Sequence, residues 1–485
     1  MTTSSDISAS DWKKNKANYW ALTPISFLER TNKIWPEKIA WIHGSKSNTY
    51  KELHSRCRKI ANGLKIKGIK KGDTVAALLP NVPAMIECHF SVMMAGAILN
   101  TINTRLDSKA IAFILKHGKA KMIFVDPEFN KVITEAIECI ALEERPLIVK
   151  CKDEEFIKNS PIKNEITNDD IAEMGNTKAP LEWPNDEWDA CSLNYTSGTT
   201  GHPKGAMQSH KAVITNGAMT SQVHMRGPDD VVVSALPCPH VYANVLMTGM
   251  MMFGTKLVLH KIFDPIKVLQ DIKVHKATLF DGVPTMYMFI LNSPSFSGAD
   301  LSSLKRCYVG GQTMPVATME AVEKGFKIPL YELWGMTEIA GLGSTHPLYG
   351  KNKHGSIGCA IPYCELRIAD VDDVSKTMPR GEVGELMVSG PIVMMGYFGD
   401  EEKTRETLEA DGWLHTGDLG TMDEDGCVFI VDRKKDMILV SGFNVYPNEI
   451  EGVVAEMDDV LEVAAIGKES SDSGELVKLF VVKKN

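Results

Sequence analysis

The sequence lacks any apolar run long enough to cross a membrane. Its most apolar stretch, residues 245–253, is much shorter than the roughly 18 residues that a transmembrane helix requires. Residues 1–20 also contain no apolar core of the kind that a signal peptide has. We therefore expect no integral membrane segment and a cytoplasmic protein.

Positive charge is scarce as well. Lys and Arg number 53 against 62 Asp and Glu, so the formal net charge is −9. A mildly acidic chain is poorly suited to hold nucleic acid by neutralising phosphates, and we expect no nucleic-acid partner. Small anionic ligands are still compatible with this balance, because backbone amides and a few local Lys or Arg side chains are enough to bind them.

Paired cysteines are missing too. The ten Cys residues are scattered along the chain without a single C-x-x-C pair, and no His or Cys group surrounds the nearest two, Cys359 and Cys364. This pattern argues against a zinc site or a disulfide framework. We expect buried, reduced thiols.

What the sequence does contain is a repeated alternation of apolar strands and helices. Residues 74–79 form an apolar run that ends at a Pro-Asn turn, and residues 83–97 then have the length and apolar face of a helix. The same order recurs at 231–236 followed by 244–253, and a helix is again predicted at 315–326. This alternation predicts an α/β fold with largely parallel sheets.

The pattern changes near residue 355. Short apolar segments at 365–369, 384–388 and 427–431 are separated by Gly, Pro and Asp turns, as in a small β-rich unit. The charged stretch DRKKD at 432–436 follows and has the character of a linker. With 485 residues, the chain is long enough for two or three folding units.

The segment 195–205, YTSGTTGHPKG, carries the strongest chemical signal. It contains three Gly, four Thr or Ser and one Lys. Glycines let a backbone approach a ligand closely, while hydroxyls, amides and Lys204 offer donors and charge to phosphate oxygens. It is not a Walker A loop, because Pro203 stands between the glycine and Lys204. By composition alone, a flexible surface loop would explain it equally well.

This string resembles the signature loop of the adenylate-forming superfamily, which includes acyl-CoA synthetases, adenylation domains and beetle luciferases. Further segments resemble motifs of that family in the same order, and the chain is similar to its AMP-forming acyl-CoA synthetase branch from about residue 20 to the end. The further segments that carry the resemblance are Gly310-Gly311-Gln312, YELWGMTE at 331–338, GWLHTGD at 412–418, DRKKD at 432–436 and SGFNVYPNEIE at 441–451.

The resemblance implies an architecture. It predicts a large N-terminal AMP-binding domain at 1–431, built of stacked mixed sheets with packed helices, with a β-barrel-like subdomain at about 355–431. A hinge at 432–436 and a small, truncated α+β domain at 437–485 would follow.

The resemblance also implies the site. The catalytic residues would be Thr196, Lys204, Thr337 and Glu338, with Glu338 and Thr196 holding Mg²⁺. The acyl pocket would comprise His240, Tyr242, Val283, Gly335 and Gly341. Nucleotide and CoA contacts would come from Thr196, Ser197, Gly198, Thr199, Thr200, Gly201, Lys204, Gly310, Gly311, Gln312, Glu332, Leu333, Trp334, Gly335, Met336, Thr337, Asp418, Ile430, Arg433, Lys435, Ser441 and Gly442.

Several of these side chains suit their implied roles chemically. Asp418 offers the two acceptors that a ribose diol requires, and Glu338 is a hard oxygen ligand suited to Mg²⁺. Arg433 is always charged and donates in a fork. Taken singly, each has an ordinary alternative: a turn Asp, a Glu at a helix start, a solvated Arg. For His240, packing or gating is favoured over acid–base catalysis.

The implied reaction has two steps, with ATP, Mg²⁺ and coenzyme A as cofactors. A carboxylic acid, an unbranched fatty acid in our interpretation, would be activated to acyl-AMP and then transferred to CoA. Two alternatives remain at this point: an adenylation enzyme that loads a carrier-protein thiol, and a non-catalytic or truncated nucleotide-binding relative. A homodimer is the candidate assembly.

One departure from the family concerns the end of the chain. The family carries a catalytic Lys in a Gly-Lys stretch near its C-terminus, whereas this sequence ends with LFVVKKN at 479–485, directly after an apolar strand. The sequence therefore predicts an incomplete C-terminal domain and weak adenylation, with the thioester-forming step retained.

Overall fold

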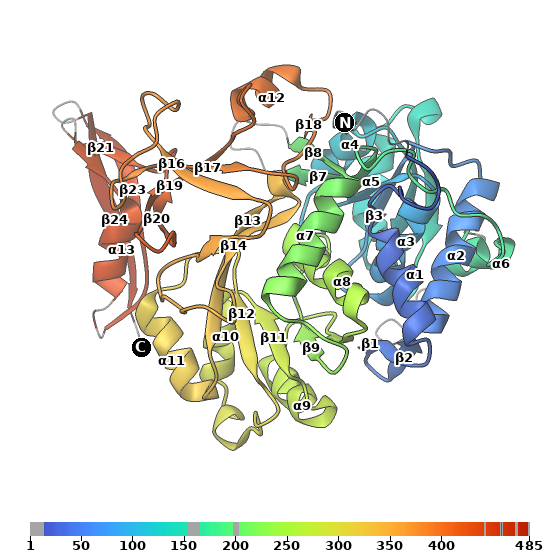
Figure 1. Ribbon diagram of the computed structural model, residues 1–485, viewed down its shortest axis with the longest axis horizontal. Helices are drawn as coiled ribbons and strands as arrows, with labels where there is room; N and C mark the ends of the chain where they lie inside the picture. The colour runs from blue at the N-terminus through green and yellow to red at the C-terminus, as the bar shows by residue number, and fades with distance from the viewer. Residues whose placement is uncertain are drawn as a thin grey trace, which may run out of the picture.

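The computed structural model describes residues 14–153, 155, 165–196, 203–440, 443–455, 457, 459–470 and 474–483. Its architecture is α/β, as the alternation of apolar segments predicted. Two large mixed sheets form the bulk of the molecule, and two smaller antiparallel sheets complete it (Figure 1). Among the described residues, no helix has both the length and the apolar character needed to span a bilayer.

The larger sheet has nine strands in the order β15-β14-β13-β12-β11-β9-β10-β1-β2. The pairs from β1 through β13 are parallel, and the outer pairs at both edges are antiparallel. The strands are β1 (Ile39–His43), β2 (Lys46–Thr49), β9 (Val231–Ser234), β10 (Lys256–Leu259), β11 (Leu279–Gly282), β12 (Arg306–Val309), β13 (Leu330–Met336), β14 (Gly341–Thr345) and β15 (Cys359–Ala360). The crossover helices are α9 (Pro265–His275), α10 (Pro284–Leu291) and α11 (Val316–Phe326).

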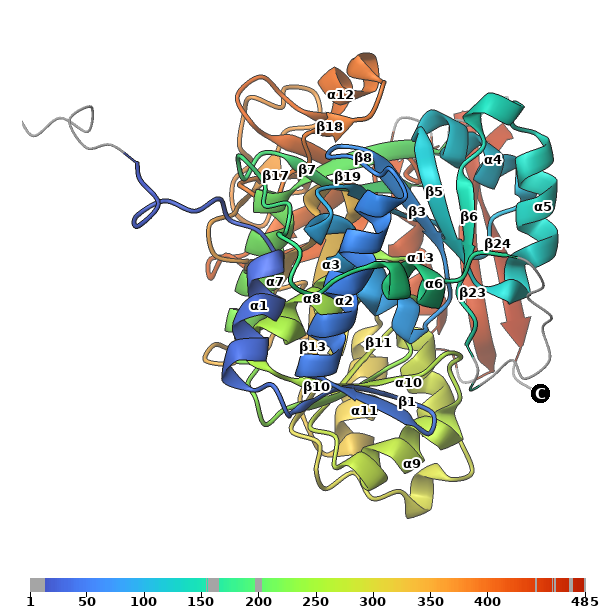
Figure 2. The same cartoon turned by 90° about the vertical axis from the view of Figure 1, so that its right-hand side faces the viewer.

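The second sheet has seven strands in the order β18-β8-β7-β4-β3-β5-β6. They are β3 (Thr74–Leu78), β4 (Ile98–Thr101), β5 (Ala120–Val125), β6 (Leu147–Lys150), β7 (Ala190–Thr196), β8 (Lys204–Ser209) and β18 (Gly396–Tyr397). Every residue of β3 is buried, which accounts for its unbroken apolar sequence. Helices of this region are α1 (Ile25–Ile34), α2 (Tyr50–Ile66), α3 (Pro83–Met94), α4 (Ser108–His117), α5 (Asn130–Glu138) and α6 (Asn168–Met174). Figure 2 shows α1 and α2 side by side on one side of the molecule.

Two helices occupy the middle of the molecule, between the two large sheets (Figure 1). The first, α7 (His210–Val223), begins after Ser209, whose hydroxyl accepts a hydrogen bond from the Ala212 amide. The second, α8 (Val241–Phe253), starts three residues earlier than the predicted segment and is buried over most of its length. It ends at Gly254, where φ is +70°. This burial explains why the sequence of α8 is apolar without a polar face.

Beyond residue 355 the chain is largely strand, as predicted. An antiparallel four-stranded sheet has the order β16-β17-β19-β20, and a second has the order β22-β21-β24-β23. Their bounds are β16 (Glu365–Ala369), β17 (Gly384–Ser389), β19 (Leu414–Met422), β20 (Val428–Arg433), β21 (Ile438–Val440), β22 (Phe443–Val445), β23 (Val460–Ser470) and β24 (Gly474–Lys483). Helices α12 (Glu401–Thr407) and α13 (Pro447–Ala455) accompany them. The predicted hinge at 432–436 connects β20 to β21.

The ten cysteines are free thiols, as predicted. Seven are buried, two are partly buried and Cys139 is exposed. The expectation of uniformly buried thiols was therefore wrong at Cys139, which follows α5 on the outside of the second sheet.

Candidate active site

One cavity of about 660 Å³ gathers residues that lie far apart in the sequence. Side chains and backbone from β7, β8, the start of α8, the β13–β14 connection, β19 and the predicted hinge line it. Among its lining residues are these predicted ones: Thr196, Lys204, His240, Tyr242, Gly311, Leu333, Gly335, Met336, Thr337, Glu338, Gly341, Asp418, Arg433 and Lys435.

Other predicted residues lie elsewhere. Those that the structure describes but that do not line this cavity are Val283, Gly310, Gln312, Glu332, Trp334 and Ile430. Ser197, Gly198, Thr199, Thr200, Gly201, Ser441 and Gly442 lie outside the described residues. Val283 packs behind the wall, since a Cβ on Gly311 would lie 3.5 Å from its Cγ1.

The connection between β13 and β14 is fixed by buried amide side chains. Nδ2 of Asn216, on α7, donates to the Ile339 carbonyl at 2.9 Å and to the Leu342 carbonyl at 2.8 Å. Nε2 of Gln208, on β8, donates to the Thr337 carbonyl at 2.6 Å. These bonds hold the single 3₁₀ turn, Thr337–Ile339, that presents Thr337 and Glu338 to the cavity.

Glycine is required where this connection folds back on itself. Gly341 has φ of +133°, and a Cβ on Gly335 would lie 1.8 Å from the Gly341 carbonyl oxygen. Both positions therefore exclude a side chain. The close approach brings β13 and β14 together on either side of the turn that carries Glu338.

Glu338 is joined to Lys204 through a tyrosine that the sequence analysis did not single out. Oη of Tyr397, on β18, donates to Oε1 of Glu338 at 2.7 Å, and Nζ of Lys204 donates to Oη of Tyr397 at 3.3 Å. The Lys204 ammonium also lies 4.4 Å from the centre of the Tyr397 ring. Burial, followed by the neighbouring Glu338 carboxylate, raises the pKa of Tyr397, so the phenol remains protonated and able to donate.

Asp418 also lines the cavity, and both of its carboxylate oxygens are engaged. Nε of Arg433 donates to Oδ1 at 2.6 Å, and Nε1 of Trp334 donates to Oδ2 at 2.7 Å. Burial raises the pKa of Asp418, against the opposing effects of Arg433 and Trp334. A carboxylate has about four lone-pair positions, so each oxygen can accept one further hydrogen bond.

A second charged network borders Asp418 and was also missed. Glu385, on β17, is 2% exposed; its Oε1 lies 3.2 Å from Nδ1 of His415, and its Oε2 accepts from Nζ of Lys434 at 2.9 Å. Nε2 of His415 lies 2.8 Å from Oε1 of Glu409. Lys434 belongs to the predicted hinge, so this network joins the hinge to the four-stranded sheet. In the sequence, Glu385 lies in the pair GE at 384–385 and His415 in the string HTGD at 415–418, and these strings could have indicated both residues.

The His415 network predicts a pH-dependent contribution to stability. The hydrogen bond to Glu385, with help from Glu409, raises the pKa of His415 above 6.5. Because the folded protein binds this proton more tightly, the contribution is complete below pH about 6.5 and is lost as pH rises through the higher folded pKa. Urea unfolding between pH 6 and pH 9 is expected to show a smaller loss of stability for His415→Gln than for the unsubstituted chain. The same dependence of the free energy of unfolding on pH in both proteins would contradict this prediction.

The chain has several relatives among known proteins. The family model described as AMP-binding enzyme matches residues 28–398. A long-chain-fatty-acid–CoA ligase of Bacillus subtilis (strain 168) is 34% identical over 95% of this chain and 85% of its own length. The acetate–CoA ligase CCL3 of Humulus lupulus is 33% identical over 98% and 87%. The crystal structure of ATP-bound MatB from Rhodopseudomonas palustris superposes with a TM-score of 0.87 at 28% identity, covering 96% of this chain and 89% of that one.

Proposed function

The chain belongs to the AMP-binding enzyme family, and we propose that it is an AMP-forming carboxylate–CoA ligase that activates an unbranched aliphatic acid. One observation supports this most directly. A single cavity is lined both by the Lys204–Tyr397–Glu338 chain and by the Asp418 carboxylate. A nucleotide needs both kinds of group, a cation for its phosphates and an acceptor for its ribose hydroxyls.

The first step joins the acid to AMP. A carboxylate does not react with a thiol, because its oxygen is a poor leaving group. We propose that the substrate carboxylate attacks the α-phosphorus of ATP, which forms acyl-AMP and releases pyrophosphate. The protein's contribution is positioning and electrostatic stabilisation of the phosphoryl oxygens. Lys204 supplies positive charge, and the Thr196 and Thr337 hydroxyls supply donors from the same wall.

The ribose would bind at Asp418, which lines the same cavity. Asp418 accepts from the ribose hydroxyls with the lone pairs that Arg433 and Trp334 leave free. Because those two donors already fix the carboxylate, the acceptor is oriented before the nucleotide arrives, which reduces the ordering cost of binding.

The residues at the phosphate end also fit a magnesium ion. Glu338 and Thr196 offer oxygen ligands to the cavity, and Mg²⁺ prefers oxygen and commonly arrives with the phosphates of a nucleotide. When bound, the ion would neutralise phosphate charge during adenylation. The hydrogen bond from Tyr397 would hold in place the Glu338 carboxylate that offers oxygen to the ion.

The second step transfers the acyl group to CoA. The thiol attacks the acyl carbon, and AMP leaves with the bonding electrons. We propose that the chain pivots at Lys435 in the hinge 432–436 between the two steps, which exposes a second face of the site. Lys434 binds Glu385 in the conformation described here, so that contact would open when the hinge turns.

A direct assay tests the ligase assignment. The purified chain is incubated with ATP, Mg²⁺, CoA and a panel of carboxylic acids, and acyl-CoA and AMP are measured by mass spectrometry. Formation of both products is expected. A parallel reaction with synthetic acyl-AMP isolates the second step, and a third replaces CoA with a pantetheinylated carrier protein. Acyl transfer to the carrier but not to CoA would contradict the proposal, as would the absence of ATP and AMP binding by calorimetry.

A further inference from the structure

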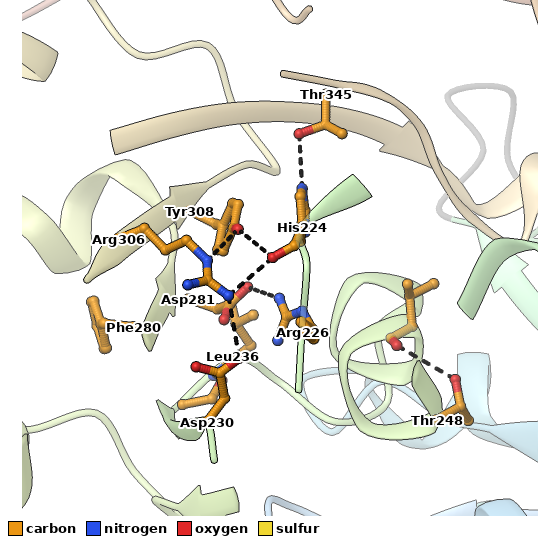
Figure 3. A network of polar contacts seen from close by, with 12 residues as sticks. His224, Arg226, Asp230, Leu236, Thr248, Phe280, Asp281, Arg306, Tyr308 and Thr345 are labelled. Atoms are coloured by element: carbon orange, nitrogen blue, oxygen red, sulfur yellow. Dashed lines mark hydrogen bonds and ion pairs between the residues drawn. The ribbon is translucent and has the colours of Figure 1, made fainter. Parts of the chain in front are cut away.

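A cluster of buried charges lies behind Tyr242, which lines the cavity and is one of the residues predicted to form the acyl pocket. Nη2 of Arg226, in the loop after α7, lies 3.0 Å from Oδ1 of Asp281 on β11, and the two side chains are 3% and 0% exposed (Figure 3). Beside this pair, Nη2 of Arg306 on β12 lies 3.2 Å from Oδ2 of Asp230. Two guanidinium groups thus balance two carboxylates inside the protein, and removing any one would leave an uncompensated buried charge.

The cluster is anchored to the surrounding elements by further contacts. The His224 ring stacks on Tyr308 with 3.9 Å between ring centres, and its Nε2 lies 3.0 Å from Oγ1 of Thr345 on β14 (Figure 3). Nε of Arg306 donates to Oη of Tyr308 at 3.0 Å. Burial, then the two arginines, lowers the pKa of His224, so that His224 adds no charge. The cluster therefore connects α7 with β11, β12 and β14 in one rigid wall.

Tyr242 stands between this wall and the cavity. The residue lines the cavity from the first turn of α8, while its hydroxyl is fully buried. Within the described residues, that hydroxyl, Oδ2 of Asp281 and Nη1 of Arg226 have no hydrogen bond of ordinary distance and angle. Burial first, and the Asp281 carboxylate second, raise the pKa of Tyr242, so the phenol is neutral and adjacent to the ion pair.

The other walls of the acyl end are closely packed. A Cβ on Gly341 would lie 2.2 Å from Cγ2 of Val245, and a Cβ on Gly310 would lie 2.2 Å from Cδ1 of Leu333. Val283 lies behind Gly311. The backbone at Gly341 and Gly310 therefore has no room for even a methyl group between it and these neighbours.

We propose that Tyr242, backed by the Arg226–Asp281 pair, ends the acyl pocket and restricts this ligase to short straight-chain acids. A longer alkyl chain would have to displace the tyrosine ring and lie against buried charged groups. A hydrocarbon makes no hydrogen bond to them, and pushing the ion pair apart would leave two buried charges uncompensated, which is strongly unfavourable. Apolar side chains could repack around the extra methylenes of a longer acid. The Arg226–Asp281 ion pair cannot move in this way without separating two buried charges. This inference rests on the proposed ligase function and specifies its substrates as short straight-chain acids.

A chain-length series tests the limit without any substitution. The values of kcat/KM for acyl-CoA formation are measured with straight-chain acids from acetate to hexadecanoate. Butyrate is expected to exceed hexadecanoate by at least about 100-fold, the scale on which a pocket rejects substrate that does not fit. Equal use of butyrate and hexadecanoate would overturn the proposal. Absence of product with every acid would instead refute the ligase assignment itself.

Variants then assign the limit to Tyr242. Tyr242→Ala removes the end wall, and the octanoate-to-butyrate ratio of kcat/KM is expected to rise by about 10- to 100-fold. Tyr242→Phe retains the ring and is expected to keep the preference for short acids. Tyr349→Ala removes an exposed tyrosine outside the cavity and is the matched control, with no change in the ratio. An unchanged ratio in folded Tyr242→Ala would overturn the assignment.

Discussion

Replacing Glu338 by Gln is expected to slow acyl-AMP formation by about 100- to 1,000-fold, the loss that follows removal of one group aimed at developing charge. The substitution keeps the shape of the side chain but removes the negative charge that a magnesium ion requires. It also changes the acceptor that Oη of Tyr397 meets at 2.7 Å. Because Tyr397 also contacts Lys204, the substitution would disturb the position of the Lys204 ammonium as well as the Glu338 side chain.

The measurement is pyrophosphate release across a series of MgCl₂ concentrations. For Glu338→Gln, the Mg²⁺ concentration at half-maximal rate is expected to increase together with the fall in rate. Tyr397→Phe removes only the orienting hydroxyl and is expected to cause a smaller loss in the same direction. Glu401→Gln changes an exposed glutamate on α12, outside the cavity, and serves as the matched control. An unchanged Mg²⁺ dependence in Glu338→Gln would refute the role proposed for this residue.

Replacing Asp418 by Ala is expected to weaken AMP and ATP binding by about 10- to 100-fold. Hydrogen bonds to a charged acceptor contribute about 1.5–3 kcal/mol each, and the ribose would lose such an acceptor. Nε1 of Trp334 and Nε of Arg433 would also lose the partner that both now contact. The Arg433 side chain is 56% exposed and can be solvated instead, so most of the effect should fall on binding.

Titration calorimetry with AMP measures this effect directly, without catalysis. Asp411→Ala is the matched control, because Asp411 is exposed and lies in the turn before β19. Thermal unfolding of both variants separates a loss of binding from a loss of structure. AMP affinity that survives in Asp418→Ala would place the ribose elsewhere and remove the central argument for the nucleotide site.

Much of the candidate site could be predicted because its chemistry lies in short strings. Thr337 and Glu338 are neighbours in one 3₁₀ turn, so the sequence that specifies the turn also places both side chains. Tyr397, Glu385 and His415 escaped prediction for the opposite reason. Each is a common residue in an ordinary strand, and its importance arises only from a partner distant in the sequence: Glu338 for Tyr397, and Lys434 for Glu385.

The fold likewise has features that short segments of sequence predict and features that depend on distant partners. Alternating apolar segments predicted α/β structure, but they did not indicate that β1 pairs with β10, more than 200 residues later, or that β18 pairs with β8. Strand neighbours depend on which apolar faces cover one another, and local periodicity does not contain that information. The pairing of β18 with β8 is also what brings Tyr397 to Lys204.

By itself, the sequence determined many of the elements, the α/β class and the groups that we propose bind phosphate and ribose, because these depend on residues close together in the chain. Only the tertiary structure decided which of them share a cavity. It placed Lys204, Glu338 and Asp418 around one space, and it set Tyr242 against a buried ion pair assembled from the loop after α7 and from β11. Long-range packing fixes these distances, and it is the sum of many contacts that no single segment specifies.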